Sequence, residues 1–138
     1  MKQLLKDGGV YILRFDRDDE VLSGITSFAE ARNVEAGTFL GIGAASRVVI
    51  SYYDLETKQY LDVALEEVEI ASLTGNIGTL NGKRVVHAHG VFSGRDCVAK
   101  SGHVKEVVVS GTCEARFEAL SGKLQRMHDA ETGLNLLT

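Results

Sequence analysis

The stretch EVEIASLTGNIGTLNGKRVVHAHGVF, residues 67–92, decides the fold of this chain. At its centre, Asn81-Gly82 is the strongest hairpin signal in the sequence, because a type I′ turn needs positive φ angles at both central positions. Apolar and β-branched residues flank this turn on both sides. We therefore expect a long strand within Glu67–Leu80 and a returning strand over Lys83–Phe92, which together form an antiparallel hairpin.

Towards the N-terminus, the pattern predicts one strand and one helix. Val10–Phe15 (VYILRF) is apolar apart from a single arginine, which is typical of a strand. The acidic run Asp16–Glu20 offers an N-cap and acidic first-turn residues, which suit the positive end of a helix. We expect the helix to end near Asn33, because asparagine tolerates a left-handed conformation. The apolar residues at helical spacing between these points are Val21, Leu22, Ile25, Phe28 and Ala29.

Most of the remaining chain is predicted to be β-structure. One helix with about seven strands, many joined by tight turns, indicates an α+β domain. We expect a mainly antiparallel sheet with the N-terminal helix over one face, in a single domain over residues 1–138. The further strands are expected over Ala36–Ile42, Arg47–Tyr53, Gln59–Leu65, Cys97–Lys100 and Val107–Leu120, with one or two short strands between Lys123 and Leu137 around a turn at Asp129–Gly133.

The composition is that of an ordinary globular domain, and it argues against several classes of protein. No apolar stretch approaches the roughly 20 residues that span a bilayer, and residues 1–7 lack the features of a signal peptide. We therefore expect a cytoplasmic protein with no membrane partner. Cys97 and Cys113 form no Cys-x-x-Cys motif and are expected to be reduced thiols. The net charge of −4 disfavours nucleic-acid binding through the overall field of the protein.

Three of the four histidines are clustered in the sequence, which points to a metal site. His87 and His89 are two residues apart in a predicted strand, so both side chains project from the same face. Their Cα atoms would lie about 6.5 Å apart, which allows both rings to lean towards one ion. His103 follows after a short turn. The alternative is that all three are ordinary surface or half-buried histidines, and His128, in the polar tail, is assigned no role.

The position of the third histidine follows from the expected hairpin register. A turn centred on Gly94-Arg95 would place His87 opposite Gly102 and His89 opposite Lys100, which leaves His103 one position out of register. A small irregularity at Gly102 would bring His103 to the other two rings, because glycine is common at bulges. Water or another group would then complete a tetrahedral site.

Catalysis at such a site would require an acid or base within reach of the metal. Glu67, Glu69 and Glu106 are the candidates by strand adjacency, although solvated or ion-paired carboxylates are the simpler interpretation of each. The sequence contains no nucleophile elbow, phosphate loop or zinc-protease motif. Gly41–Ala45 faintly resembles a dinucleotide loop, but a strand pattern follows it and no helix, so we interpret it as tight strand packing.

Several short motifs, taken in order, make the chain similar to a known family. The order resembles that of the PPC domain, the "plants and prokaryotes conserved" domain, a family of unknown function, over roughly Gly9 to Glu118. The motifs are Arg14 after a β-run, Gly41-Ile42-Gly43-Ala44 followed by Tyr52-Tyr53-Asp54, the segment Glu69–Ile77, His87-Ala88-His89, and Gly102-His103.

The resemblance implies a stand-alone prokaryotic domain that forms a homotrimer. It also implies a metal ion, zinc or another divalent transition metal, on a histidine cluster, whose ligands in this sequence would be His87, His89 and His103. The apolar runs Val48–Ile50 and Val107–Val109 separately suggest a sheet covered on both faces. Neighbouring subunits would provide that cover, or the sheet would curl on itself.

The resemblance also raises DNA as a partner. Plant members carry AT-hook motifs, which need an Arg-Gly-Arg-Pro core, and this chain contains no proline. The plant Gly-Arg-Phe-Glu-Ile segment corresponds here to Glu66–Ile70, in which an acidic residue replaces the arginine. Lys83-Arg84, Lys123 and Arg126 are the basic groups that could contact DNA, although a solvated surface is the simpler interpretation of them. Three hypotheses result: a trimeric metal-binding protein, a DNA-associated protein, and a metal-dependent hydrolase or lyase that acts on a small molecule.

Overall fold

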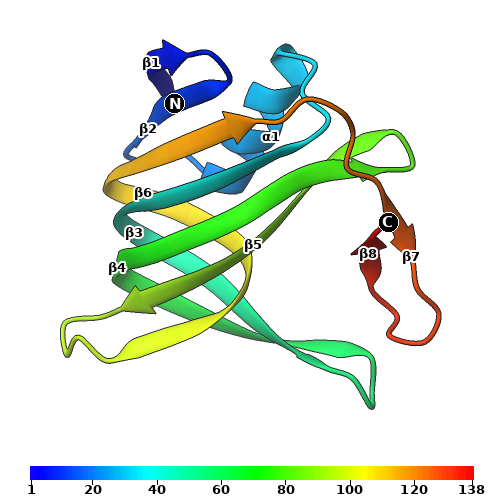
Figure 1. Cartoon of the computed structure of the whole chain (residues 1–138). Coiled ribbons are helices and arrows are strands. Elements are labelled where there is room, and N and C mark those ends of the chain that lie inside the picture. Colours follow the sequence, from blue (N-terminus) through cyan, green and yellow to red (C-terminus); the bar gives the residue numbers. More distant parts are fainter.

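The structure, a computed structural model, describes all residues from 1 to 138. Six strands form one antiparallel sheet in the order β1-β2-β6-β3-β4-β5, and β6 also pairs with β5, so that the sheet closes on itself (Figure 1). Two short strands form a separate hairpin. The elements are β1 (Lys2–Asp7), β2 (Val10–Asp16), α1 (Val21–Ala31), β3 (Gly37–Asp54), β4 (Gln59–Leu80), β5 (Lys83–Ser93), β6 (Ala99–Ala119), β7 (Arg126–His128) and β8 (Asn135–Leu137).

The predicted fold class is confirmed, and so is the turn that joins β4 to β5. Asn81 and Gly82 adopt φ angles of 50° and 79°, as the type I′ prediction requires. The C-terminal tail forms the two short strands expected around residues 129–133. With 11 residues, α1 falls short of the length and apolarity that a transmembrane helix needs.

The central strands are longer than predicted. β3, β4 and β6 each join two segments that the sequence analysis separated, because irregularities bend these strands without ending them. The pairing of β3 with β4 shifts between Gly41 and Gly43, and its pairing with β6 shifts at three places. At Gly43, a Cβ atom would lie 2.1 Å from the carbonyl oxygen of Thr112, so only glycine allows this close approach. Such bulges increase strand twist and curl the sheet.

Strand β1 was not predicted. All six of its residues are exposed, so its sequence, KQLLKD, shows no alternation between buried and exposed positions. It pairs with β2 as an edge strand through a turn at Gly8, whose φ angle is 54°. Its pairing is fixed by that turn and not by a buried face.

The start of α1 differs in part from the prediction. Glu20 is the N-cap, and its carboxylate accepts hydrogen bonds from the backbone N–H groups of Leu22 and Ser23. The first turn itself contains no acidic residue, so that part of the prediction was wrong. The aspartates before Glu20 instead form the turn between β2 and the helix. Asn33 follows the last helical turn with a φ angle of 54°, as expected.

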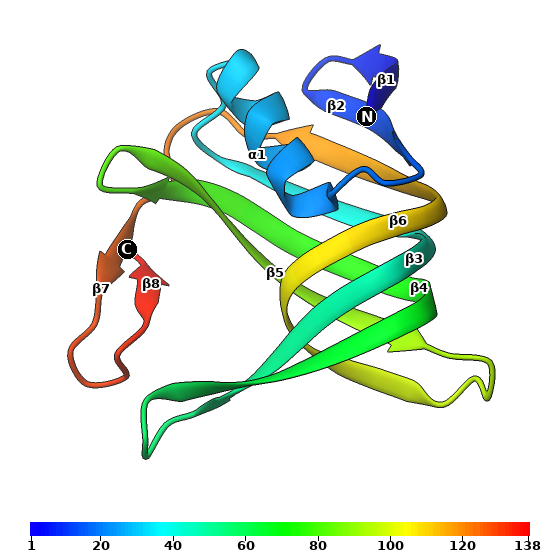
Figure 2. The same cartoon turned by 180° about the vertical axis from the view of Figure 1, so that it is seen from behind.

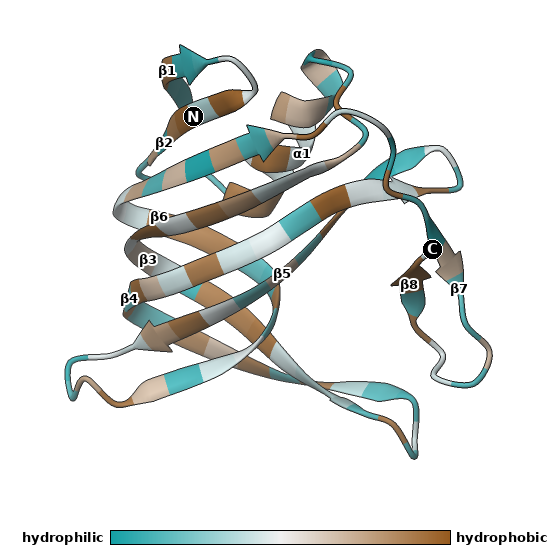
Figure 3. Ribbon diagram, in the orientation of Figure 1, coloured by the Kyte–Doolittle hydropathy of each residue, from teal (hydrophilic) through white to brown (hydrophobic).

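The core lies inside the curled sheet, and α1 packs against β5 and β6 at one end of it (Figure 2). Tyr11, Phe28 and Phe117 form an aromatic cluster there, with ring centroids 5.0 to 6.4 Å apart, and Phe28 packs edge-to-face against both other rings. Apolar and polar positions alternate along the strands (Figure 3). The sequence analysis left two ways to cover the apolar runs, by neighbouring subunits or by a sheet that curls on itself. The curled sheet is present within a single chain.

Candidate metal centre

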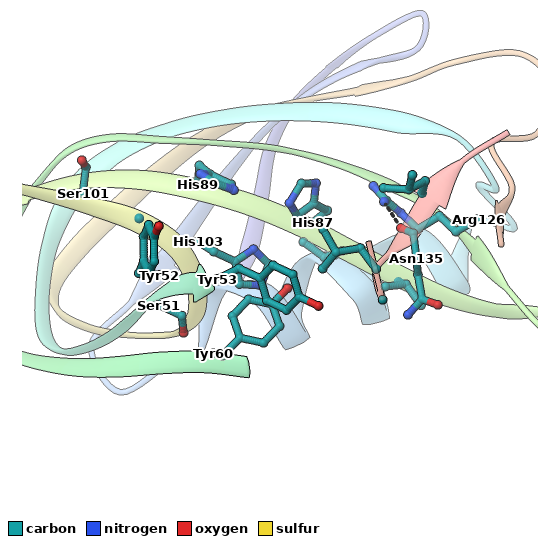
Figure 4. Close-up of a pocket in the computed structure, with 16 residues that line it drawn as sticks. Ser51, Tyr52, Tyr53, Tyr60, His87, His89, Ser101, His103, Arg126 and Asn135 are labelled. Carbon is teal, nitrogen blue, oxygen red and sulfur yellow. Dashed lines mark hydrogen bonds between the residues drawn. The ribbon is translucent and has the colours of Figure 1, made fainter. Parts of the chain in front are cut away.

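Three histidines converge on one side of the β5–β6 pair. His87 and His89 both project from β5, and His103 projects from β6 (Figure 4). Each residue offers a nitrogen atom, and these atoms all lie within 4.8 Å of one another. The ring centroids are 5.2 to 5.5 Å apart. The cluster predicted from the sequence is therefore formed.

The register that forms this cluster differs from the predicted one. His89 pairs with His103, and Gly102 pairs with Gly90, so no irregularity at Gly102 is needed. The prediction was wrong because the connection is longer than a tight turn. Residues 94–98 form a five-residue loop, in which Cys97 has a φ angle of 57° and its N–H donates to the carbonyl oxygen of Gly94.

The three imidazoles line a cavity of about 600 Å³, a volume typical of small-molecule sites. Its walls come from β3, from the start of β4, from β5 and β6, and from the C-terminal hairpin. Two hydrogen bonds hold the turn of that hairpin against β3 and the β3–β4 turn. The hydroxyl group of Tyr53 donates to the carbonyl oxygen of Thr132 at 2.8 Å, and the ammonium group of Lys58 donates to that of Ala130 at 2.8 Å.

Burial lowers the pKa of two of the three imidazoles, His87 and His103, and so favours the neutral form that binds metals. Burial lowers the pKa of His103 to about 4, with smaller contributions from His87 and His89. Burial also lowers the pKa of His87, and the positive charge of Arg126 adds to this shift. Near neutral pH, lone pairs on these rings are therefore available to a cation.

A layer of polar and aromatic contacts supports His103. The ring of Tyr60 lies 5.2 Å from the ring of His103, with 32° between their planes. The ammonium group of Lys105 sits 4.7 Å from the centre of the Tyr60 ring and forms an ion pair with Asp62 at 2.7 Å. Asp62 also accepts a hydrogen bond from Ser51. These contacts restrict the ring on which His103 packs.

Arg126 is a residue of this cavity to which the sequence analysis gave no role in the site. Its side chain is buried, with 8% of the residue exposed. Its Nη1 atom donates to the main-chain oxygen of Asn135 at 2.9 Å, and its Nη2 atom donates to Oδ1 of Asn76 at 2.6 Å. The Nε atom is buried without a hydrogen-bond partner. Burial lowers the pKa of Arg126 from its ordinary value.

The candidate carboxylates do not line this cavity. Glu106 forms an ion pair with Arg47 at 2.9 Å. Glu69 is exposed beside a different depression, on the outer side of β3 and β4. Glu67 is exposed and has a φ angle of 48° within β4. The exposed His128 also lies outside the cavity.

The basic residues considered for DNA binding are mostly engaged within the protein. Arg84 donates to the carbonyl oxygen of Val34 and to the side chain of Asn33. Lys123 forms an ion pair with Glu35 at 3.1 Å. Arg126 is buried in the histidine cavity.

Both cysteines are free, and burial raises the pKa of Cys113 to about 11.

The fold and the histidine cluster define a small antiparallel β-protein with a candidate metal site. The family model named Plants and Prokaryotes Conserved (PCC) domain matches residues 3–120, so the chain belongs to this family. This confirms the resemblance found in the sequence. No curated protein is significantly similar to the chain.

Several solved structures share the whole fold. A metal-containing protein from Archaeoglobus fulgidus is 33% identical, with a TM-score of 0.89 over 100% of this chain and 99% of that one. A protein from Bacteroides thetaiotaomicron, provisionally named as DNA-binding, is 28% identical, with a TM-score of 0.94 over 99% and 96% of the two chains. A plant- and prokaryote-conserved protein from Pyrococcus horikoshii is 27% identical, with a TM-score of 0.87 over 99% and 94%.

Proposed function

We propose that this chain is a metal-binding protein that holds one divalent transition metal ion, zinc in the first instance, on His87, His89 and His103. The observation that carries the proposal is the convergence of three nitrogen atoms to within 4.8 Å. Zinc–nitrogen bonds of about 2.1 Å at tetrahedral angles need nitrogen atoms about 3.4 Å apart. Small rotations of the three rings would reach that separation, so the residues fit the metal.

The relative from A. fulgidus supports this proposal, because it is described as containing a metal and shares the fold over nearly its whole length. The donor set supports zinc in particular. Imidazole ligands suit zinc, copper, iron and nickel, whereas magnesium and calcium prefer oxygen ligands. Zinc sites with three protein ligands characteristically leave a fourth position for water or substrate.

A metal-dependent hydrolase or lyase is the second candidate function, and the cavity favours it. The fourth position of the metal would open into a space of about 600 Å³, large enough for a small molecule. A bound zinc ion would supply Lewis-acid chemistry there. The residues of the chain would contribute orientation and shielding from water. No carboxylate lines the cavity and its three histidines would hold the metal, so a proton would have to be moved by a tyrosine or water.

We also propose that the protein assembles as a homotrimer, as the family resemblance implies. Exposed apolar side chains on the outer side of β3 and at the tip of the β3–β4 hairpin support a subunit contact: Leu40 and Ile42 are 53% and 58% exposed, and Leu61 and Val63 are 58% and 49% exposed. Light scattering should report three times the 14.9 kDa of one chain. A monomer would contradict this proposal.

DNA association is the alternative that the name of the relative from B. thetaiotaomicron suggests for this chain. A surface that contacts phosphates binds with an affinity that falls steeply as salt increases. Titration of a labelled duplex at about 50 mM salt, repeated at about 200 mM, tests this alternative. The absence of binding at the lower concentration would exclude it.

Elemental analysis of the protein, purified without added metal, tests the proposed function. We expect about one zinc ion per chain in the wild type and none in a His87→Ala/His89→Ala variant. A His128→Ala variant is the matched control, because His128 lies outside the cavity, and it should keep its metal. Equal metal content in all three proteins would rule out the proposed site.

A further inference from the structure

The histidine cavity contains a second feature that suits a ligand, a buried cation without a counter-ion. Arg126 is 92% buried, because only 8% of the residue is exposed. It takes part in none of the ion pairs of the structure. Its two hydrogen-bond acceptors, Oδ1 of Asn76 and the main-chain oxygen of Asn135, are neutral amide oxygens. A buried charge usually has an opposite charge beside it, because leaving water is costly for an ion.

Arg126 is placed beside the metal ligands by the strand pairing. Asn76 on β4 is the direct cross-strand partner of His87 on β5. Side chains of direct partners share one face of the sheet, with Cβ atoms about 4.5–5.5 Å apart. The hydrogen bond of 2.6 Å from Arg126 to Asn76 therefore holds the guanidinium group against the residue that pairs directly with His87. His87 and Arg126 both line the cavity (Figure 4).

The rest of the cavity wall contains no negative charge. It is built from imidazole, hydroxyl, amide and apolar groups, and no aspartate or glutamate lines it. With a metal ion bound, the cavity would hold two sources of positive charge in a protein whose net charge is −4. An arginine fork binds planar carboxylate groups through paired hydrogen bonds, and Arg126 has N–H groups left for this because only two of its five are used.

We propose that the cavity binds a small organic anion, whose carboxylate group pairs with Arg126 while a neighbouring oxygen atom reaches the metal on the three histidines. This inference rests on the proposed metal site and adds the class of ligand to it. Tyr53, Val85 and Leu134 give the cavity an apolar side, which suits a short carbon chain. Arg126 also lies outside residues 3–120, which the family model matches. The preference for a carboxylate ligand would therefore come from the C-terminal hairpin of the chain.

Calorimetric titration of the zinc-loaded protein with lactate tests the proposal, because lactate carries a carboxylate next to a hydroxyl group. Lactamide, its neutral analogue, is the matched ligand. Charged hydrogen bonds of this kind contribute roughly 10- to 100-fold in affinity. We expect lactate to bind at least about tenfold more tightly than lactamide. Equal binding of the two, or no binding of lactate, would overturn the proposal.

Variants of Arg126 provide the second arm, with the metal content of each protein determined first. At full metal loading, Arg126→Gln should reduce lactate affinity by roughly 10- to 100-fold. Arg84→Gln is the control, because Arg84 hydrogen-bonds with Val34 and Asn33 and does not line the cavity. If Arg126→Gln does not fold, Arg126→Lys, which keeps the charge and loses the fork, is measured instead and should still weaken lactate. Unchanged lactate affinity in the folded variant would contradict the proposal.

Two further outcomes separate this proposal from related ones. If the wild type holds no metal, the proposed function is wrong, and lactate is then titrated into the metal-free protein. A preference for lactate over lactamide that depends on Arg126 would retain the anion site, and its absence would overturn it. If inorganic phosphate binds more tightly than lactate with the same dependence on Arg126, the ligand class is phosphate and the carboxylate assignment is wrong.

Discussion

His89 and His103 are direct partners across the antiparallel pair of β5 and β6. This pairing joins the two halves of the histidine cluster, because His87 shares the face of His89 on the same strand. The same pairing closes the sheet, since β6 otherwise binds β2 and β3. The candidate site therefore lies at the closure of the fold, where two strands distant in sheet order meet.

Loss of any one histidine of the cluster should sharply weaken metal binding. We expect His103→Ala to reduce zinc affinity by more than the roughly 10- to 100-fold that loss of an outer-shell partner costs, because a direct ligand is removed. Competition against a chromophoric zinc chelator measures this change. His128→Ala should retain the wild-type affinity, and a His103→Ala variant that also retained it would exclude His103 as a ligand.

Acid should destabilise the metal-free protein through His103. Burial lowers the pKa of His103 to about 4, below the ordinary value of 6.5. Between these two pH values the unfolded chain binds a proton that the folded chain does not, so the free energy of unfolding falls as the pH falls. We expect a His103→Gln variant to lose less stability than the wild type between pH 7 and pH 5, measured by urea unfolding.

An NMR titration provides the direct check on that prediction. The imidazole signals of His103 should not shift until the pH falls well below 5 in the metal-free protein, whereas the exposed His128 provides a comparison within the same spectrum. An apparent pKa near 6.5 for His103 would contradict the effect of partial burial on this ring.

The C-terminal hairpin should be held to the cavity by Tyr53. Its hydroxyl group donates to the carbonyl oxygen of Thr132 at 2.8 Å. Tyr53→Phe should lower the free energy of unfolding by about 0.5–1.5 kcal/mol, the usual contribution of one such bond, and should speed amide hydrogen exchange in residues 126–137. Tyr52→Phe is the matched control, because Tyr52 is 69% exposed. Equal stability of the two variants would argue against this anchor.

Core packing and helix propensity have opposite effects at Gly24, where α1 closely contacts Phe15 of β2. An added Cβ at Gly24 would lie 2.6 Å from a ring carbon of Phe15, which is fully buried. Alanine would gain about 0.5–1 kcal/mol in helix propensity, but overpacking costs about 1–3 kcal/mol. We therefore expect Gly24→Ala to destabilise the protein by thermal unfolding. Ser27→Ala, on the exposed side of the same helix, should be neutral or slightly stabilising. A more stable Gly24→Ala variant would contradict the described packing.

Local chemistry explains which parts of the fold were predictable from sequence. Asn81-Gly82 determined its turn, and Asn33 the end of the helix, because their backbone preferences act over a few residues. The histidine cluster was also predictable, since side chains two apart on a strand share a face. The continuity of β3 through Gly43 was not, because its bend depends on the close approach of Thr112 from another strand.

Long-range contacts explain what the sequence did not reveal about the site. The pairing of His89 with His103 depends on a five-residue loop, whose length cannot be judged from the dipeptide Gly94-Arg95 alone. The role of Arg126 depends on its bond to Asn76, fifty positions earlier in the chain. A lone arginine in a polar tail carries no local signal of burial.

A crystal structure with anomalous diffraction data collected at the zinc absorption edge tests the metal site most directly. We predict one anomalous peak per chain, about 2.1 Å from a nitrogen atom of each of His87, His89 and His103, with its open side facing the cavity that contains Arg126. The absence of a peak from protein supplied with zinc, or a peak elsewhere with the three rings turned apart, would contradict the account.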